Sequence, residues 1–168
     1  PKEITEMKKI SLLLIAITTL ASAQLRIGLD ISREISLAGI ESEKADGMGF
    51  TLGYEQMLLS LVGVGAEYSI AGDEGIDMLY GYAVGKIPVG VPMARGIIRV
   101  GYSLPMGDAS EFYDAGLAYG GGLRIKPPLF PVGIEALYTI HNLEMKSSGD
   151  EMEDMFMDLL KMKWNVLN

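Results

Sequence analysis

The sequence predicts an all-β protein, an eight-stranded antiparallel up-and-down barrel whose strands cross a membrane. Three observations predict this fold. Eight segments alternate between apolar and small or polar residues with a period of two, the periodicity of strands with two different faces. The connections between these segments are alternately short and long. The mean hydropathy is positive, yet no apolar stretch reaches the roughly 20 residues of a membrane-spanning helix.

Composition narrows the function classes before any motif is considered. The chain has 168 residues, which suits one domain. Its formal net charge of −8, with only 14 Lys and Arg, argues against a nucleic-acid-binding protein, which normally carries a basic patch. Without cysteine, the chain has no disulfide, thiolate metal site or thiol nucleophile. We expect no nucleic-acid partner, no cofactor and no bound metal.

The N-terminal segment has the three parts of a secretory signal peptide. Two lysines follow Met7, residues 10–20 form an apolar segment too short to be an anchor, and residues 21–23 form a small-x-small cleavage site. We predict cleavage between Ala23 and Gln24; the alternative is an amphipathic or buried N-terminal helix. The predicted organisation is an untranslated leader read in frame over 1–6, a signal peptide over 7–23 and a barrel over 24–168.

The alternating segments are the predicted strands. In most of them an apolar face of Leu, Ile, Val and Tyr opposes a face of Gly, Ala, Ser and Thr with a few charges. The last segment is less regular, because Asp158 falls on its apolar face, and a bulge near Leu159 and Leu160 repairs the phase. The segments cover residues 25–32, 48–55, 62–70, 78–85, 97–104, 115–125, 132–141 and 156–167.

The connections predict how the strands are oriented. Residues 58–61, 86–92 and 126–131 form short turns, whereas the other connections are longer and acidic. An up-and-down meander places all short turns at one end and all long loops at the other, as outer-membrane barrels do. The long connections are residues 33–47, 71–77, 105–113 and 143–155.

The few charges on the face of small residues indicate that this face points inward. Small residues suit a crowded barrel interior, and three arginines there balance three glutamates, as buried ions require. The predicted ion network inside the barrel consists of Arg26, Glu55, Glu67, Arg99, Arg124 and Glu135.

Seven of the eight tyrosines lie on the apolar face, which we interpret as an aromatic girdle at the membrane boundary. A soluble, lipocalin-like ligand-binding barrel, with the tyrosines packed inward across strands, is the alternative. The girdle tyrosines are Tyr54, Tyr68, Tyr80, Tyr82, Tyr102, Tyr119 and Tyr138.

These features resemble the OmpA and OmpX type of small outer-membrane barrels, a family of the Gram-negative cell envelope. The resemblance covers residues 24–168 and rests on architecture. It implies an outer-membrane location, a lumen plugged by the six charged residues above, contact with outer-membrane lipid, and assembly by the barrel-assembly machinery. Such barrels usually end in an aromatic residue, whereas this chain ends Trp164-Asn165-Val166-Leu167-Asn168. Either the last strand is atypical, or the C-terminus is truncated or out of frame.

The predicted role is structural or surface-interacting, with an extracellular partner at the acidic loops. A narrow ion-conducting pore is the second hypothesis. A lipid enzyme is the third, built on His141 with Ser103, Ser69 and Glu67, and we expect no enzyme because a lone histidine is more often a polar interior residue. Acidic residues at 150, 151, 153 and 154 lack the spacing of a calcium loop and are interpreted as a solvated external loop.

Overall fold

The computed structural model describes residues 23–37, 43–72, 75–127, 129, 132–146 and 162–168. The predicted leader, all of the signal peptide but Ala23, the acidic cluster at 150–154 and the bulge near Leu159 lie outside these residues. Within the part of the chain that is described, no helix is long and apolar enough to span a membrane.

The described residues are all-β, as predicted, apart from one helical turn. The elements are β1 (Ala23–Asp30), β2 (Ser32–Leu37), β3 (Glu43–Lys44), β4 (Gly49–Met57), β5 (Val62–Ile70), β6 (Met78–Pro88), β7 (Ala94–Pro105), α2 (Ala109–Phe112), β8 (Tyr113–Asp114), β9 (Gly116–Ile125), β10 (Ile134–Met145) and β11 (Met162–Leu167).

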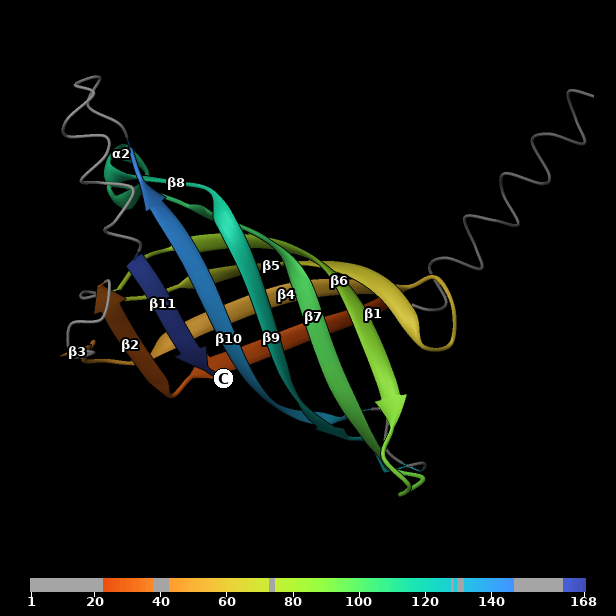
Figure 1. Ribbon diagram of the computed structural model, residues 1–168. Coiled ribbons are helices and arrows are strands. Elements are labelled where there is room, and N and C mark those ends of the chain that lie inside the picture. The colour runs from red at the N-terminus through yellow and green to blue at the C-terminus, as the bar shows by residue number, and fades with distance from the viewer. Residues whose placement is uncertain (1–22, 38–42, 73–74, 128, 130–131, 147–161) are drawn as a thin grey trace, which may run out of the picture.

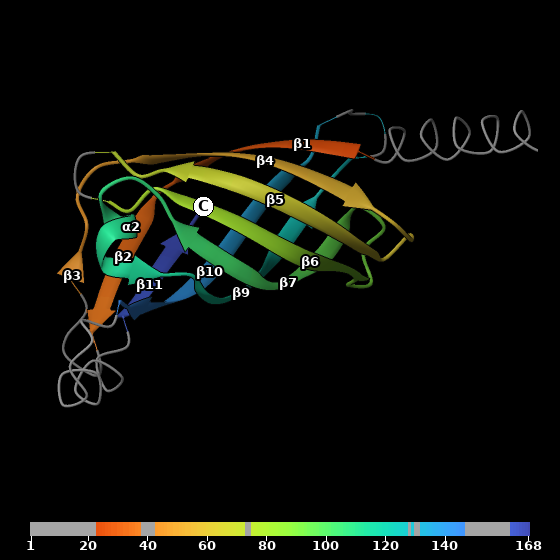
Figure 2. The ribbon, with the colours of Figure 1, turned by 90° about the horizontal axis from the view of Figure 1, so that it is seen from above.

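The strands form one antiparallel sheet that curls back toward its own first strand (Figures 1 and 2). The order is β1-β4-β5-β6-β7-β9-β10-β11-β2-β3, and β8 pairs with β10. Only Ile31 separates β1 from β2. One continuous stretch of chain therefore supplies both the first strand and the next-to-last strand of this order. The first half of this stretch pairs with β4 and the second half pairs with β11.

The eight predicted strands are therefore not reproduced as eight uninterrupted segments. The structure divides the described residues into eleven strands. The predicted loop over residues 33–47 contains most of β2 and all of β3, because the chain changes partner at Ile31 and continues as a strand. The loop over 105–113 contains α2 and the start of β8, and β10 continues to Met145.

The predicted asymmetry of the connections is present. The β4–β5, β6–β7 and β9–β10 connections lie at one end of the curled sheet, and α2, β3 and β8 lie at the other (Figure 1). The backbone amide of Leu58 donates to the carbonyl of Val62 over 3.0 Å, and that of Ala94 donates to Val91 over 3.0 Å, which closes two of the short turns.

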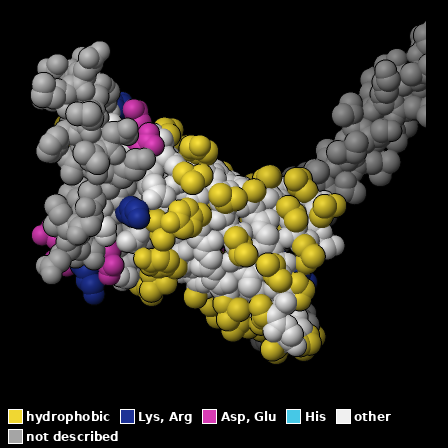
Figure 3. Space-filling view, viewed as in Figure 1, with side chains coloured by type: hydrophobic (Ala, Val, Ile, Leu, Met, Phe, Trp, Pro, Cys, Tyr) yellow, Lys and Arg dark blue, Asp and Glu magenta, His cyan; other side chains and the backbone are white. Residues whose placement is uncertain are grey.

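The apolar face points outward on most strands, as predicted. Leu25, Ile98 and Tyr102 are 72%, 57% and 65% exposed, whereas Arg99, between Ile98 and Val100 on β7, is 1% exposed. Figure 3 shows hydrophobic side chains spread over the wall, while nearly all charged side chains in that view gather at the end with β3 and α2. The sheet is thus apolar outside and polar inside along β1, β4, β5, β7, β9 and much of β10.

Strand β6 has the opposite phase from the prediction. Tyr80 and Tyr82 are buried at 1% and 5% exposure, so they face inward and do not belong to an outward girdle. The reason is that Lys86 shares their face and pairs with buried Glu55. The outward face of β6 carries Leu79, Ile87 and small residues, which need no polar partner outside.

Strand β11 is also inverted. Trp164 and Val166 are buried, while Lys163 is exposed. The apolar face of this strand therefore points inward, although it was predicted to point outward like the apolar faces of the other strands. There it joins Met78 and Leu143 in an apolar cluster toward the end with the long connections. Residues 156–161 of the predicted last strand lie outside the described residues.

Candidate functional site

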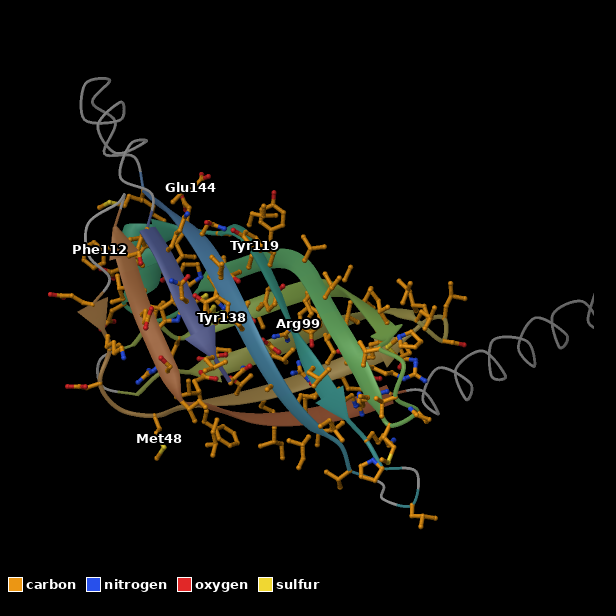
Figure 4. All side chains as sticks on the ribbon, turned by 60° about the horizontal axis from the view of Figure 1, so that its bottom comes forward. Met48, Arg99, Phe112, Tyr119, Tyr138 and Glu144 are labelled. Atoms are coloured by element: carbon orange, nitrogen blue, oxygen red, sulfur yellow. The ribbon has the colours of Figure 1, made fainter. Side chains whose placement is uncertain are left out.

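Five of the six predicted charged residues meet inside the curled sheet. Each comes from a different strand, and period-two alternation turns each of them inward. Figure 4 shows Arg99 inside the sheet, whereas Tyr119 on β9 lies on its outer side. The five residues, named here the interior charge network, are Arg26 on β1, Glu67 on β5, Arg99 on β7, Arg124 on β9 and Glu135 on β10.

The network is a continuous chain of ion pairs. The Arg124 guanidinium lies 3.2 Å from Glu135, and Glu135 lies 2.8 Å from Arg26. Arg26 in turn lies 2.8 Å from Glu67, whose Oε2 also accepts a 2.6 Å hydrogen bond from Arg99. Glu67 and Arg99 are almost fully buried. Removing one member of a buried ion pair typically costs about 3–5 kcal/mol, because the other charge is left uncompensated.

Glycines in the neighbouring strands make room for these contacts. Gly53 on β4 is the register partner of both Arg26 on β1 and Glu67 on β5, so these two side chains meet across it. A Cβ at Gly53 would lie 3.1 Å from the Cβ of Glu67. Gly120 lies in the same way between Arg99 and Thr139, which are joined by a 3.0 Å hydrogen bond.

The sixth predicted residue, Glu55, has a partner that the sequence analysis missed. It pairs with Lys86, which was assigned to a short turn but is a buried residue of β6. Lys86 also donates to the side-chain oxygen of Gln24 over 2.9 Å. The signal was present in the sequence, because Lys86 is in phase with Tyr82 and Val84 and the other face of β6 carries no charge.

The two inward tyrosines contact the network. Arg26 donates a 2.9 Å hydrogen bond to the Tyr82 hydroxyl. The Arg99 guanidinium lies 4.7 Å from the centroid of the Tyr82 ring and 5.5 Å from that of Tyr80. Such cation–π contacts contribute about 0.5–2 kcal/mol, with more when the pair is desolvated. The other five predicted girdle tyrosines, Tyr54, Tyr68, Tyr102, Tyr119 and Tyr138, are exposed on the outer side.

Other polar side chains form hydrogen bonds outside the interior charge network. The side chain of Arg33 is buried, donates to the Asp46 carbonyl over 2.8 Å and reaches the Ala71 carbonyl. Sequence analysis placed Arg33 in a loop, so it was missed. Thr51 donates to Asp30 over 2.9 Å and lies 3.0 Å from Ser69.

Ser103 and His141 form the contact on which a hydrolytic site would depend. Ser103 Oγ lies 2.5 Å from His141 Nδ1, and both side chains are buried inside the sheet. Glu67 is engaged by two arginines and Ser69 contacts Thr51, so neither completes a triad with this pair. The Tyr80 ring packs edge-on against the imidazole, with the centroids 5.4 Å apart. This arrangement can anchor β10 to β7 by a buried hydrogen bond.

Among the described residues, no three His, Asp or Glu side chains are grouped so as to hold a metal ion. The acidic residues 150–154 are outside this set.

The chain matches no family model and no curated protein. Its fold is similar to the crystal structure of Ail, the attachment invasion locus protein of Yersinia pestis, with a TM-score of 0.47, 18% identity, and coverage of 86% of this chain and 93% of that chain. A second structure of Ail, in complex with the heparin analogue sucrose octasulfate, gives a TM-score of 0.43 and 18% identity over 86% of this chain and 94% of that one. Likeness at this level shows neither a shared family nor a shared function.

Proposed function

We propose that this protein is an integral outer-membrane β-barrel with a charge-paired, plugged interior, and that its role is structural or surface-interacting. One observation carries the proposal: the molecule is apolar outside and charged inside. Among the described residues, 33 large hydrophobic side chains are exposed, whereas Arg99, Glu67, Glu55 and Lys86 are buried. Soluble monomers rarely expose contiguous apolar patches above a few hundred Å², and a lipid environment removes that penalty.

Strand length supports the same proposal. The strands β4, β5, β6, β7, β9 and β10 have 9, 9, 11, 12, 10 and 12 residues. A tilted strand needs about 9–11 residues to cross the hydrocarbon core. The outward apolar positions therefore form a band of suitable height, and the soluble lipocalin-like alternative, which needs the apolar face inside, is disfavoured.

The interior supports a plugged barrel over an open pore. The Arg26–Glu67–Arg99 contacts cross the lumen, and Trp164 fills part of it toward the end with the long connections. Conduction requires these pairs to separate and admit water. We therefore expect planar bilayers containing the protein to show no discrete, reproducible current steps; regular steps would support the narrow-pore alternative.

The end with the long acidic connections is the proposed surface that meets an extracellular partner. In this topology the short turns face the periplasm. The predicted signal peptide provides the route of export, and the barrel-assembly machinery inserts the mature chain into the outer membrane.

Heat modifiability in dodecyl sulfate gels tests the proposal. A folded membrane barrel migrates as a compact band when it is not boiled and as a slower band after boiling. We expect this shift for protein recovered in the outer-membrane fraction. Recovery in the soluble fraction, with the same mobility before and after boiling, would contradict the membrane assignment.

A further inference from the structure

A cavity at the end of the barrel with the short turns is lined by basic side chains. Its volume is about 400 Å³ and its wall comes from the three short turns and the adjoining strand ends. Lys86, Arg95, Arg124 and Lys126 line it, and none of its described lining residues carries a carboxylate. We name it the basic cavity. Four cations on one wall are unusual in a chain that has 14 Lys and Arg against 22 Asp and Glu.

Two of these four cations have no counter-ion among the residues that the structure describes. Lys86 is neutralised by Glu55, and Arg124 lies 3.2 Å from Glu135. Within the described part of the chain, the side chains of Arg95 and Lys126 form no ion pair or hydrogen bond. Both residues are exposed at this end of the sheet, so a ligand in the cavity can reach their charges.

The register places like charges side by side. Arg95 on β7 is the direct cross-strand partner of Arg124 on β9, and like charges opposite each other destabilise a sheet. Gly133 leaves room for this crowding, because a Cβ there would lie 3.1 Å from Arg124 Nε and 3.2 Å from Lys126 Cβ. An anion between these side chains would turn the repulsion into attraction.

The basic cavity adjoins a second one that opens through the wall. Among the described residues, β1 pairs along one edge only, with β4, and the Ile134–Ala136 part of β10 pairs only with β9. A second cavity, of about 490 Å³, is lined by residues of both edges and shares Gln24, Arg124 and Lys126 with the basic cavity. Glu135, which pairs with Arg26 and Arg124, also lines it. Exposed apolar residues, including Leu25, Ile27 and Val132, border it. This gives the basic residues access both from the mouth of the barrel and from the side.

We propose that the basic cavity is a binding site for a phosphate-bearing anion, held by Arg95 and Lys126 together with Arg124. A phosphate group offers several acceptor oxygens to guanidinium and ammonium donors, which form charge-assisted hydrogen bonds with it. Access from the mouth suits a free phosphate, and access through the side opening suits the phosphate of a lipid headgroup.

The test uses the full chain folded in zwitterionic detergent micelles with 0.15 M chloride, which screens weak surface attraction. Binding is measured by titration calorimetry with inorganic phosphate and, separately, with micelles containing phosphatidylglycerol. The double variant Arg95→Gln, Lys126→Gln removes two cations that have no ion pair to lose. The control variant Lys44→Gln, Lys146→Gln removes the same charge at the opposite end of the barrel.

We expect the site variant to weaken binding by about tenfold or more, because it removes two cationic donors that can form charge-assisted hydrogen bonds with the anion. The control should bind like the parent. Saturable binding of inorganic phosphate identifies a soluble anion. Binding of phosphatidylglycerol alone, beyond phosphatidylcholine, identifies a lipid headgroup. Equal losses in both variants, or no binding of either probe to the parent, would overturn the proposal.

Discussion

Replacement of Glu67 by glutamine tests the interior charge network at its central residue. Glu67 contacts two arginines, with Arg26 at 2.8 Å and Arg99 at 2.6 Å, and its side chain is more buried than that of Glu135, which also contacts two. The amide keeps the shape but removes the charge that both guanidinium groups need. Arg26 retains Glu135, whereas Arg99 retains only Thr139 and the tyrosine rings. The substitution leaves mainly the buried charge of Arg99 without compensation, so we expect a loss of about 3–5 kcal/mol in the free energy of unfolding.

The assay is urea unfolding of the protein in phospholipid vesicles, followed by tryptophan fluorescence. The single tryptophan, Trp164, is 1% exposed and reports the interior directly. Glu144→Gln is the matched control, because Glu144 is exposed on β10 (Figure 4) and its neutralisation should change stability by less than about 0.5 kcal/mol.

A double-mutant cycle separates the pair from its surroundings. If Glu67 and Arg99 act on each other, Glu67→Gln combined with Arg99→Met should cost less than the sum of the single losses. A change of less than about 0.5 kcal/mol for Glu67→Gln, or strict additivity in the cycle, would refute the reasoning, because it would show that the buried charges do not depend on each other.

Three further predictions test which side chains of the sheet point inward and which point outward. Val100→Arg places a charge on the outward face at the middle of β7 and should lower stability in lipid vesicles by about 2–4 kcal/mol, measured by urea unfolding. Gly53→Val should cost about 1–3 kcal/mol in the same assay, because the added side chain meets Glu67. Tyr82→Phe removes the hydroxyl that accepts from Arg26 and should cost about 1.5–3 kcal/mol.

The changes at Gly53 and Tyr82 each have a counterpart on the other face. Gly81→Ala should be tolerated far better than the change at Gly53, because nothing lies within 4 Å of its added Cβ. Tyr119→Phe should leave stability nearly unchanged, because this side chain is on the outer side. Equal effects of Tyr82→Phe and Tyr119→Phe would contradict the inward assignment of Tyr82, and a neutral Val100→Arg in vesicles would contradict lipid contact at β7.

The sequence by itself determined most of the strands, the end of the sheet at which each connection lies, and most of the inward charges. A period of two is a local property of the backbone, since successive side chains of a strand point to opposite sides. It therefore appears in the sequence wherever the two faces differ in composition, as on β7, where Arg99 alternates with Ile98 and Val100. The alternation of short and long connections determined which strand ends lie together.

Only the tertiary structure decided which face of β6 and β11 points inward. Over residues 78–85 of β6 both faces are apolar or small, so the alternation is present but its direction is ambiguous. Lys86 marks one face in the sequence, but only the structure shows that it pairs with Glu55 and that Tyr80 and Tyr82 point inward with it. On β11 the apolar face fills space inside the curled sheet near Leu143, and Lys163 points outward.

The tertiary structure also decided which distant residues meet. The change of partner at Ile31, from β4 to β11, depends on how far the sheet curls before its ends meet. That curl brings Arg26 on β1 to Glu135 on β10, 109 residues away in the chain. It also gathers Arg95, Arg124 and Lys126 around one cavity. Such contacts depend on register and curvature summed over the whole sheet, and no local pattern encodes that sum.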